Sequence, residues 1–469
     1  MMNAILRNPL LLTDSYKFSH FCQYPAGTTQ LTSYVEARAG AAHGQVRWFG
    51  LQGLIKHRLL ERLTRDHVAE TAEIAAAHGE PFNREGFERI VAVHGGRWPV
   101  RIQAAPEGMI VPAGNVLAQV TTSDPALPWV GSFLETLLLQ VWYPTTVCTL
   151  SHAVRESIRA RLARTADAAA AEQHLPFSLH DFGCRGASSM ESAAIGGAAH
   201  LVNFLGTDTV PALAWLRAYY GEAMAGFSIP AAEHSTITAW GKDGEEAAYR
   251  NMVRQFAGPG KRTPLGIVAV VSDSYDLARA VGELWGRKLK QDVIESGGRI
   301  VVRPDSGSPA EVVVATLRQL AGAFGSSVNG KGYHVLHPAV RVVQGDGMTE
   351  RTIPVVLDAV AAAGFSAENV VFGMGGGLLQ QVNRDTERFA MKASAAVVEG
   401  AAREISKQPL TDMTKASKAG RLALVRDDRG ALATVPESSL AGRANLLRDV
   451  YADGDLVLDE TLAAIRARS

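Results

Sequence analysis

Short apolar strands in the middle of this chain are each followed by residues suited to binding anions or metal ions. The residues just past these strands are Ser272-Asp273, Arg303-Pro304-Asp305, Gly345-Asp346-Gly347 and Gly375-Gly376-Gly377. In parallel α/β folds, ligands bind at the carboxyl ends of the strands, and the late loops of a barrel often hold phosphate. The pattern therefore predicts an active site on the strand-end loops.

Each of these groups has both a chemical and a structural interpretation. Asp273 and Asp305 predict a Mg²⁺ site, because Mg²⁺ prefers oxygen ligands and bridges carboxylates to substrate phosphates. The structural alternative is that each aspartate caps the helix that follows it. The glycines from Gly375 to Gly377 predict backbone N–H groups that approach an anion. Their alternative is a tight turn between a strand and a helix.

His234 lies in a polar segment that begins at Pro230 and includes Glu233. A histidine beside a carboxylate and hydroxyl side chains indicates acid/base or nucleophilic chemistry, although a single histidine is more often structural. By the same reasoning Phe182 belongs to the core and Arg185 to the surface. The default for Lys392, Lys407, Lys415 and Arg421 is a solvated charge.

The elements that position these residues follow from hydrophobic periodicity. Apolar runs at 266–271, 299–302, 340–343 and 369–372 alternate with helical patterns at 275–294, 309–324 and 351–363. Short buried strands that alternate with amphipathic helices predict parallel βαβ units. Residues 97–122 alternate apolar and polar positions between turn residues, which predicts a small antiparallel sheet.

Composition excludes several classes of protein. The 469 residues include 47 Lys+Arg and 47 Asp+Glu, which argues against a nucleic-acid-binding protein that depends on a basic surface. Three widely separated cysteines argue against a disulfide framework and a zinc site. We expect a cytoplasmic protein without a membrane segment, because residues 1–13 lack a signal-peptide pattern and no run approaches about 18 apolar residues.

Several ordered motifs resemble one enzyme family, the nicotinamide phosphoribosyltransferases. The opening stretch is NPLLLTDSYKFSH (8–20). Further stretches are HDFGCRG (180–186), LVNFLGTDTV (201–210), PAAEHSTITAWGKD (230–243), VSDSYD (271–276), RPDSG (303–307), VQGDG (343–347) and FGMGGGLLQ (372–380). The resemblance runs in one order from about Asn8 to about Arg421. It also relates the chain to the nicotinate and quinolinate phosphoribosyltransferases.

The resemblance implies a fold, an assembly and a reaction. The fold would be an irregular parallel α/β barrel with a second, β-rich α+β domain formed by the N-terminal part and the C-terminal segment. We expect an N-terminal domain at 1–150, a catalytic barrel at 151–388 and a returning segment at 389–469. The assembly would be a homodimer with shared active sites. The reaction would transfer phosphoribosyl from phosphoribosyl pyrophosphate to nicotinamide, giving nicotinamide mononucleotide and pyrophosphate in NAD salvage.

The resemblance also implies a role for each residue of the nicotinamide pocket. Phe182 would stack on one face of the ring, and Tyr16 of the partner subunit would cover the other. Asp208 would accept a hydrogen bond from the carboxamide NH₂, and Arg303 would reach the carboxamide oxygen. A carboxylate at Asp208 repels the carboxylate of nicotinate, so we expect nicotinamide to be preferred.

The remaining implied residues surround the phosphates. Those along the phosphoribosyl group would be Arg185, Asp305, Gly345, Asp346, Gly375 and Gly376, with Asp273 and Asp305 binding Mg²⁺. Those from the partner subunit would be Asp14, Arg38, Arg384, Lys392 and Lys407, and Lys415 is another basic position near the phosphates. His234, beside Glu233, would be phosphorylated by ATP, which couples ATP hydrolysis to synthesis.

Two departures and three alternatives accompany this interpretation. Cys184 stands where the family usually has an aromatic residue, and Ala390 stands where a polar residue is familiar. A nicotinate phosphoribosyltransferase is disfavoured by Asp208. A non-enzymatic binding protein on the same scaffold would be expected to lose Arg303, Asp305 or His234, and all three are present. An unrelated barrel enzyme acting on phosphorylated sugars is disfavoured by the ordered motifs.

Overall fold

The structure is a computed structural model that describes residues 7–407 and 417–468. Its contacts divide the chain into two units. Unit 1 contains the residues up to Thr149, the segment Trp215–Ala223 and the residues from Val382 onward. Unit 2 contains Leu150–Ala214 and Met224–Gln381. Each unit therefore draws on segments that are far apart in the sequence.

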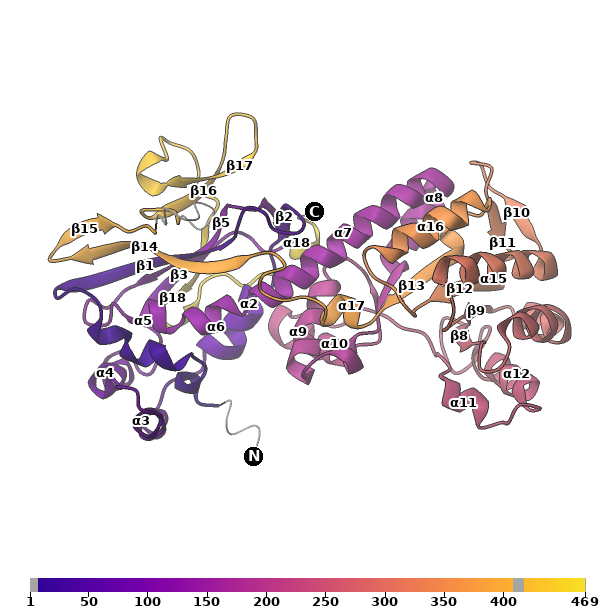
Figure 1. Ribbon diagram of the computed structural model, residues 1–469, viewed down its shortest axis with the longest axis horizontal. Coiled ribbons are helices and arrows are strands. Elements are labelled where there is room, and N and C mark those ends of the chain that lie inside the picture. Colours follow the sequence, from indigo (N-terminus) through magenta and orange to yellow (C-terminus); the bar gives the residue numbers. More distant parts are fainter. Residues whose placement is uncertain (1–6, 408–416, 469) are drawn as a thin grey trace. The chain divides into compact units, whose positions relative to one another are not determined.

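Unit 1 is built on a seven-stranded sheet in which both ends of the chain take part (Figure 1). In spatial order the strands are β15 (Ala401–Glu404), β14 (Phe389–Val398), β1 (Thr28–Ala37), β5 (Val116–Thr122), β3 (Val100–Ala104), β18 (Arg448–Ala452) and β19 (Asp455–Leu456). All neighbouring pairs are antiparallel, and β1 pairs with β14 on one side and with β5 on the other. The β-rich domain predicted from the N-terminal part and the C-terminal segment is confirmed.

Helices cover one face of this sheet and smaller strand pairs complete the unit. The helices of unit 1 are η1 (Pro9–Leu11), η2 (Ser15–Cys22), α2 (Leu51–Leu54), η3 (Ile55–Leu59), α3 (Arg65–His78), α4 (Arg84–Val93), α5 (Val130–Phe133), α6 (Glu135–Leu139), η9 (Glu437–Ser439) and α18 (Leu462–Arg466), of which α3, α4, α5 and α6 lie on the covered face. The strand pairs are β2 (Gln45–Arg47) with β4 (Ile110–Pro112) and β16 (Leu422–Arg426) with β17 (Leu432–Pro436). Aromatic rings of Phe87, Trp129 and Phe133 contact one another in the buried core.

Unit 2 is built on a six-stranded parallel sheet. In spatial order its strands are β7 (Gly206–Thr207), β6 (Leu179–Asp181), β13 (Val370–Met374), β12 (Val340–Gln344), β9 (Arg299–Arg303) and β8 (Ile267–Val271). The parallel register places Val302 of β9 opposite Val342 of β12, and Val342 opposite Val370 of β13. The four predicted apolar runs form β8, β9, β12 and β13, so this part of the prediction is confirmed.

Helices connect these strands, as expected for βαβ units. The longer helices are α7 (Trp142–Thr165, which begins in unit 1), α8 (Ala168–His174), α9 (Met190–His200), α10 (Val210–Tyr220, which ends in unit 1), α12 (Glu245–Phe256), η6 (Ala280–Lys288), α15 (Pro309–Phe324) and α16 (Thr352–Ala362). The short ones are η4 (Leu175–Phe177), η5 (Cys184–Gly186), α11 (His234–Thr238), α13 (Leu277–Arg279), α14 (Lys290–Glu295), η7 (Ala367–Asn369) and α17 (Gly376–Leu379). A hairpin of β10 (Ser326–Val328) and β11 (His334–Leu336) follows α15.

An extended segment, Phe227–Ala232, hydrogen-bonds to both edges of the parallel sheet. At the β7 edge, Phe227 N donates to Leu205 O (2.7 Å) and Thr207 N donates to Phe227 O (3.0 Å). At the β8 edge, Ala269 N donates to Pro230 O (2.9 Å), and Ala232 N donates back to Ala269 O (2.9 Å). The segment thereby curls the sheet toward a barrel, which confirms the predicted α/β class with its irregular barrel.

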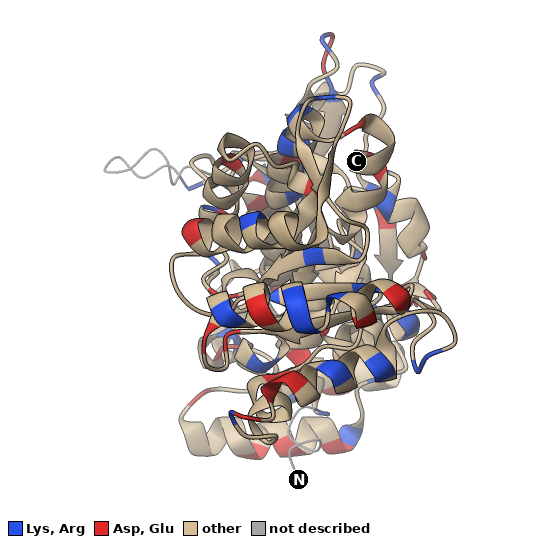
Figure 2. Ribbon diagram, turned by 90° about the vertical axis from the view of Figure 1, so that its right-hand side faces the viewer, with Lys and Arg blue, Asp and Glu red and all other residues tan. Residues whose placement is uncertain are grey.

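The inner face of the curled sheet is apolar, and charge is spread elsewhere. Ala269, Val301 and Val343 form a buried cluster on the inner face, and Phe182 packs against it. Basic and acidic residues are interspersed along the ribbon (Figure 2), consistent with the equal totals of the two kinds. Within 7–407 and 417–468, no helix is long and apolar enough to cross a membrane.

Candidate active site

The predicted strand-end residues of unit 2 gather at one edge, because parallel strands point their carboxyl ends the same way. Each predicted residue lies within two positions of the end of its strand: Phe182 after β6, Asp208 after β7, Asp273 after β8, Arg303 and Asp305 at β9, Gly345 and Asp346 after β12, and Gly375 after β13. This edge is where ligands of parallel α/β proteins bind. We take it as the candidate active site.

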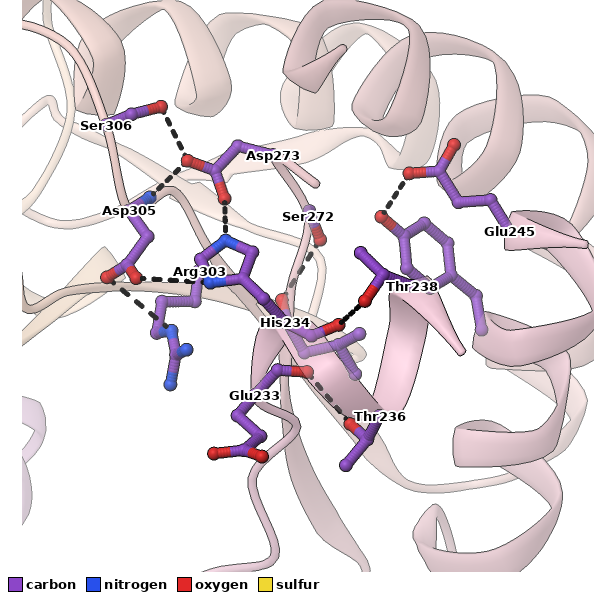
Figure 3. A network of polar contacts seen from close by, with 12 residues as sticks. Glu233, His234, Thr236, Thr238, Glu245, Ser272, Asp273, Arg303, Asp305 and Ser306 are labelled. Carbon is purple, nitrogen blue, oxygen red and sulfur yellow. Dashed lines mark hydrogen bonds and ion pairs between the residues drawn. The ribbon is translucent and has the colours of Figure 1, made fainter. Parts of the chain in front are cut away.

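His234, the first residue of α11, is held by Asp273. Its Nε2 lies 3.1 Å from Oδ1 of Asp273 (Figure 3). An ionised carboxylate only accepts hydrogen bonds, so Nε2 carries a proton, and in the neutral imidazole the lone pair is then on Nδ1. The imidazole is 47% exposed whereas the Asp273 side chain is 6% exposed. A buried carboxylate thus orients a histidine that faces solvent.

The other oxygen of Asp273 also accepts hydrogen bonds from the protein. Oδ2 accepts hydrogen bonds from the backbone N–H of Asp305 (3.0 Å) and from the hydroxyl of Ser306 (2.6 Å). Burial opposes ionisation, but these hydrogen bonds and that from His234 lower the pKa of the Asp273 carboxyl below its ordinary value. Asp273 is therefore ionised at neutral pH and joins the loops after β8 and β9.

Asp305 differs from Asp273 because its carboxylate accepts no hydrogen bond from the described part of the chain. Nδ1 of His234 and Nε of Arg303 each lie 3.9 Å from one of its carboxylate oxygens (Figure 3). Nε of Arg303 is itself buried and makes no hydrogen bond within the described residues. Buried polar atoms of this kind are uncommon in native proteins and call for a structural or functional explanation.

Neither aspartate caps a helix, so the structural alternative for both is wrong. Asp276 is the N-cap of α13 and accepts a hydrogen bond from Arg279 N (3.0 Å). Ser308 precedes α15 as its N-cap residue. The carboxylates of Asp273 and Asp305 are directed instead toward His234 and Arg303.

The donor set fits a metal ion only in part. Among the described residues, no group of three or more His, Cys, Asp or Glu side chains is arranged to hold a metal. The oxygens of Asp305 are available, whereas both oxygens of Asp273 already accept hydrogen bonds. Asp273 has an orienting role toward His234, and Mg²⁺ bound mainly by substrate oxygens with Asp305 fits this arrangement. The Mg²⁺ site expected at Asp273 and Asp305 stays a prediction.

Two glycines, one near the end of β13 and one just after β12, leave room for the Phe182 ring. A Cβ on Gly373 would lie 1.9 Å from the Phe182 ring, and one on Gly345 would lie 3.4 Å from it. The backbone N–H of Phe182 donates to Met374 O (3.0 Å). Any side chain at position 373 would displace the ring, so glycine at this position fixes the aromatic platform.

The Gly-rich loop after β13 packs against the turn that carries Arg185. Gly375 is the N-cap of α17, and a Cβ on Gly186 would lie 3.6 Å from the backbone N of Gly376. Arg185 is exposed in η5. A guanidinium and backbone N–H groups beside the Phe182 platform form a suitable place for a phosphate.

Asp208 lies beyond β7 at the same edge, and two contacts fix it. Its backbone N–H donates to Asp181 O (2.9 Å), and its Oδ1 accepts a hydrogen bond from the hydroxyl of Ser228 (2.5 Å). The β6–β7 register pairs Asp181 with Thr207, so Phe182 and Asp208 follow paired residues of adjacent strands. The backbones of Phe182 and Asp208 are therefore adjacent at this edge, and the Asp208 side chain is exposed.

Glu233 and the buried residues that support Ser272, next to Asp273, complete the unit 2 site. The carboxylate of Glu233 accepts a short hydrogen bond from Ser235. Behind Asp273, the hydroxyl of Ser272 accepts a hydrogen bond from Nε1 of Trp285 (3.1 Å). The Trp285 ring is buried and stacks on Tyr249 with centroids 4.6 Å apart. This packing anchors Ser272, the residue before Asp273.

Unit 1 contains a separate basic cavity of about 550 Å³. Its lining residues are Arg38, Glu135, Leu139, Arg384, Asp385, Arg388, Phe389, Ala390, Met391, Lys392 and Lys407. Burial lowers the pKa of the Lys392 ammonium, and the neighbouring charges of Arg38 and Lys407 add to this effect. Four of the predicted phosphate-binding cations, Arg38, Arg384, Lys392 and Lys407, thus line one cavity.

The other predicted residues of unit 1 lie outside that lining. Tyr16 is 52% exposed and its ring makes an edge contact with His20. Asp14 accepts a hydrogen bond from the hydroxyl of Thr136 (2.6 Å). Arg421, taken as a solvated charge, pairs with Glu437. Lys415 lies outside the described residues.

Sequence reasoning missed four residues that the structure places at these sites. Ser228 donates to Asp208, and Ser306 donates to Asp273. Gly373 leaves room for the Phe182 ring, and Arg388 lines the basic cavity. Ser306 and Gly373 lie inside stretches that carry the resemblance, and Ser228 lies two positions before another. Single serines and glycines have too many structural uses for their type alone to reveal these contacts.

Comparison with solved structures defines the class of the fold. A nicotinate-nucleotide pyrophosphorylase from Pyrococcus furiosus aligns with a TM-score of 0.59 at 16% identity, covering 98% of this chain and 94% of that one. The human nicotinic acid phosphoribosyltransferase aligns with a TM-score of 0.56 at 20% identity, covering 98% and 92%. The chain therefore shares its fold with these two enzymes.

Sequence comparison then identifies the family. The model of the nicotinate phosphoribosyltransferase (NAPRTase) family matches residues 177–454, and the nicotinamide phosphoribosyltransferase N-terminal domain matches residues 8–102. A nicotinamide phosphoribosyltransferase of Xanthomonas campestris is 50% identical over 99% of this chain and 98% of its own length. One of Acinetobacter baylyi is 31% identical over 98% and 97%. The chain belongs to the nicotinate phosphoribosyltransferase family, and it is an enzyme.

Proposed function

We propose that this enzyme transfers the 5-phosphoribosyl group from phosphoribosyl pyrophosphate to nicotinamide. The product would be nicotinamide mononucleotide, formed in NAD salvage. The full-length similarity to relatives named nicotinamide phosphoribosyltransferases supports this substrate. The single structural observation that carries it is the carboxylate of Asp208 beside Phe182, which suits an amide donor and repels the carboxylate of nicotinate.

The pyridine ring would stack on Phe182, with Asp208 accepting from the carboxamide N–H. Arg303 would donate to the carboxamide oxygen, a role supported by its position at the end of β9 and by its partly exposed side chain. The ring nitrogen would attack the anomeric carbon of the ribose as the bond to pyrophosphate breaks. Holding both reactants in line supplies much of the catalysis in such a displacement.

The departing pyrophosphate needs cations and N–H donors. Arg185 and the loop at Gly375 and Gly376 would supply them, with Gly345 and Asp346 beside the ribose phosphate. Mg²⁺, when bound by Asp305 and substrate oxygens, would neutralise charge on the pyrophosphate. The available oxygens of Asp305 support this choice over Asp273.

The basic cavity and Tyr16 would act on the site of a second copy of this chain. We infer a homodimer in which Tyr16 of the partner subunit covers the nicotinamide ring. The cavity lined by Arg38, Arg384, Lys392 and Lys407 would bind phosphates there, with Asp14 and Lys415 nearby. The exposed ring of Tyr16 and the concentration of cations in one cavity support this inference.

ATP would phosphorylate His234 and so couple hydrolysis to synthesis. Because Asp273 accepts from Nε2–H, the lone pair of Nδ1 would attack the γ-phosphorus of ATP, and the bond to ADP would break. The phosphohistidine would later transfer its phosphoryl group to water. The ionised Asp273 stabilises the positive charge that the ring gains on attack.

A change of substrate preference tests the assignment of Asp208. Asp208→Asn removes the charge while keeping the shape, so we expect the preference for nicotinamide over nicotinate to fall by about 10-fold to 100-fold. The measurement is kcat/KM for each substrate with saturating phosphoribosyl pyrophosphate. An unchanged preference, in a variant that melts at the wild-type temperature, would contradict the assignment.

A further inference from the structure

The segment Phe227–Ala232 carries a hydroxyl group that the proposed chemistry does not use. Ser228 Oγ lies 2.5 Å from Oδ1 of Asp208 and 3.4 Å from the carbonyl oxygen of Ile229. A hydroxyl has one proton, and its bond to a carboxylate is shorter and stronger than its bond to a carbonyl. Ser228 therefore donates to Asp208.

The backbone holds both partners of this bond. On one side of Ser228, Phe227 is bonded to the β7 edge, and on the other Pro230 accepts from Ala269 of β8. Asp208 is anchored through its N–H to Asp181 O. Both side chains are exposed, so the hydrogen bond rather than close packing restricts the Asp208 carboxylate.

We propose that Ser228 is a specificity-determining residue that acts by positioning Asp208. Its hydroxyl occupies Oδ1, and Oδ2, which accepts no hydrogen bond from the described residues, remains for the carboxamide N–H. This inference rests on the proposed function of Asp208. An exposed aspartate without this bond can rotate away from the substrate, which weakens binding of nicotinamide and reduces the repulsion of nicotinate.

The proposal predicts a change in discrimination rather than in overall activity. In Ser228→Ala we expect the ratio of kcat/KM for nicotinamide to that for nicotinate to fall about tenfold, through KM more than kcat. Ser228→Thr retains a hydroxyl and should keep the ratio within about threefold of wild type. Ser326→Ala, which removes an exposed hydroxyl from the β10–β11 hairpin, is the matched control and should leave the ratio unchanged.

The Asp208→Asn background separates positioning from direct contact. If Ser228 acts through the Asp208 carboxylate, adding Ser228→Ala to Asp208→Asn changes the ratio little further. An equal additional fall in that background, an equal loss for both substrates in Ser228→Ala alone, or an unchanged ratio in Ser228→Ala would each overturn the proposal. If the wild-type enzyme shows no preference for nicotinamide, the proposed function on which this inference rests is contradicted instead.

Discussion

Nε2 of His234 lies 3.1 Å from Oδ1 of Asp273, while Oδ2 of the same carboxylate accepts a hydrogen bond from the backbone N–H of Asp305 in the loop after β9. One buried aspartate thus fixes the tautomer of the exposed histidine and joins two strand-end loops. The two aspartates therefore have different roles: Asp273 orients His234, and the carboxylate of Asp305 remains available for a ligand.

Asp273→Asn should reduce ATP hydrolysis about 10-fold to 100-fold, because an amide does not stabilise the charge on His234 as a carboxylate does. Synthesis without ATP should fall much less. The measurement is ADP release beside nicotinamide mononucleotide formation in the same sample. ADP release at the wild-type rate would show that Asp273 has no part in phosphoryl transfer.

Gly373→Ala should reduce kcat/KM for nicotinamide about 100-fold, because the added methyl group forces the Phe182 ring out of place. Gly322→Ala is the control, since a Cβ at that position of α15 has no neighbour within 4 Å. The control should keep full activity and gain slightly in stability. Equal activity in the two variants would mean that Phe182 is not the platform for the ring.

Asp181→Asn should stabilise the enzyme at pH 8 by about 2 kcal/mol. Burial and the nearby charge of Asp208 raise the pKa of Asp181 to about 6, against the hydrogen bond from Gly183 N. The stability that protonation of Asp181 contributes is fully present below pH 3.8 and is lost as pH rises through about 6. The neutral amide does not titrate, so its advantage should be about twice as large at pH 8 as at pH 5. Thermal melting at both pH values checks this, and an equal advantage at both would contradict it.

Mixing two inactive variants tests whether the active site is shared between subunits. Tyr16→Ala and Arg303→Ala alter opposite halves of the proposed site, so each homodimer should be nearly inactive. Co-expressed in equal amounts, they should recover roughly a quarter of wild-type activity, because half of the dimers contain one unaltered site. No recovery, with mixed dimers present on a gel, would mean that each site is built from a single chain.

The regular parts of the fold could be predicted from sequence because burial dictates their pattern. The runs that became β8, β9, β12 and β13 consist mainly of Val and Ile, as is typical of strands buried on both faces. The strands β6 and β7 are only three and two residues long, too short to show a period. The edge segment Phe227–Ala232 is bonded only at its two ends, and no periodicity indicates it.

The residues of the site likewise fall into those that the sequence predicted and those that only the structure shows. Its charged residues could be predicted from the sequence, because Asp and Arg directly after buried strands indicate a binding site at the strand ends. The partners that orient them did not stand out, because the Ser228–Asp208 bond spans 20 positions and the His234–Asp273 bond spans 39. Only the fold brings such pairs together. The separate roles of Asp273 and Asp305 likewise depend on hydrogen bonds that residue type does not reveal.

Product analysis of the purified enzyme tests the central claim most directly. Phosphoribosyl pyrophosphate and Mg²⁺ are supplied with equal nicotinamide and nicotinate, with and without ATP, and the mononucleotides are separated and counted. We predict nicotinamide mononucleotide as the dominant product in both cases, with a higher yield and release of ADP when ATP is present. Nicotinate mononucleotide in equal or greater amount would contradict the proposed function.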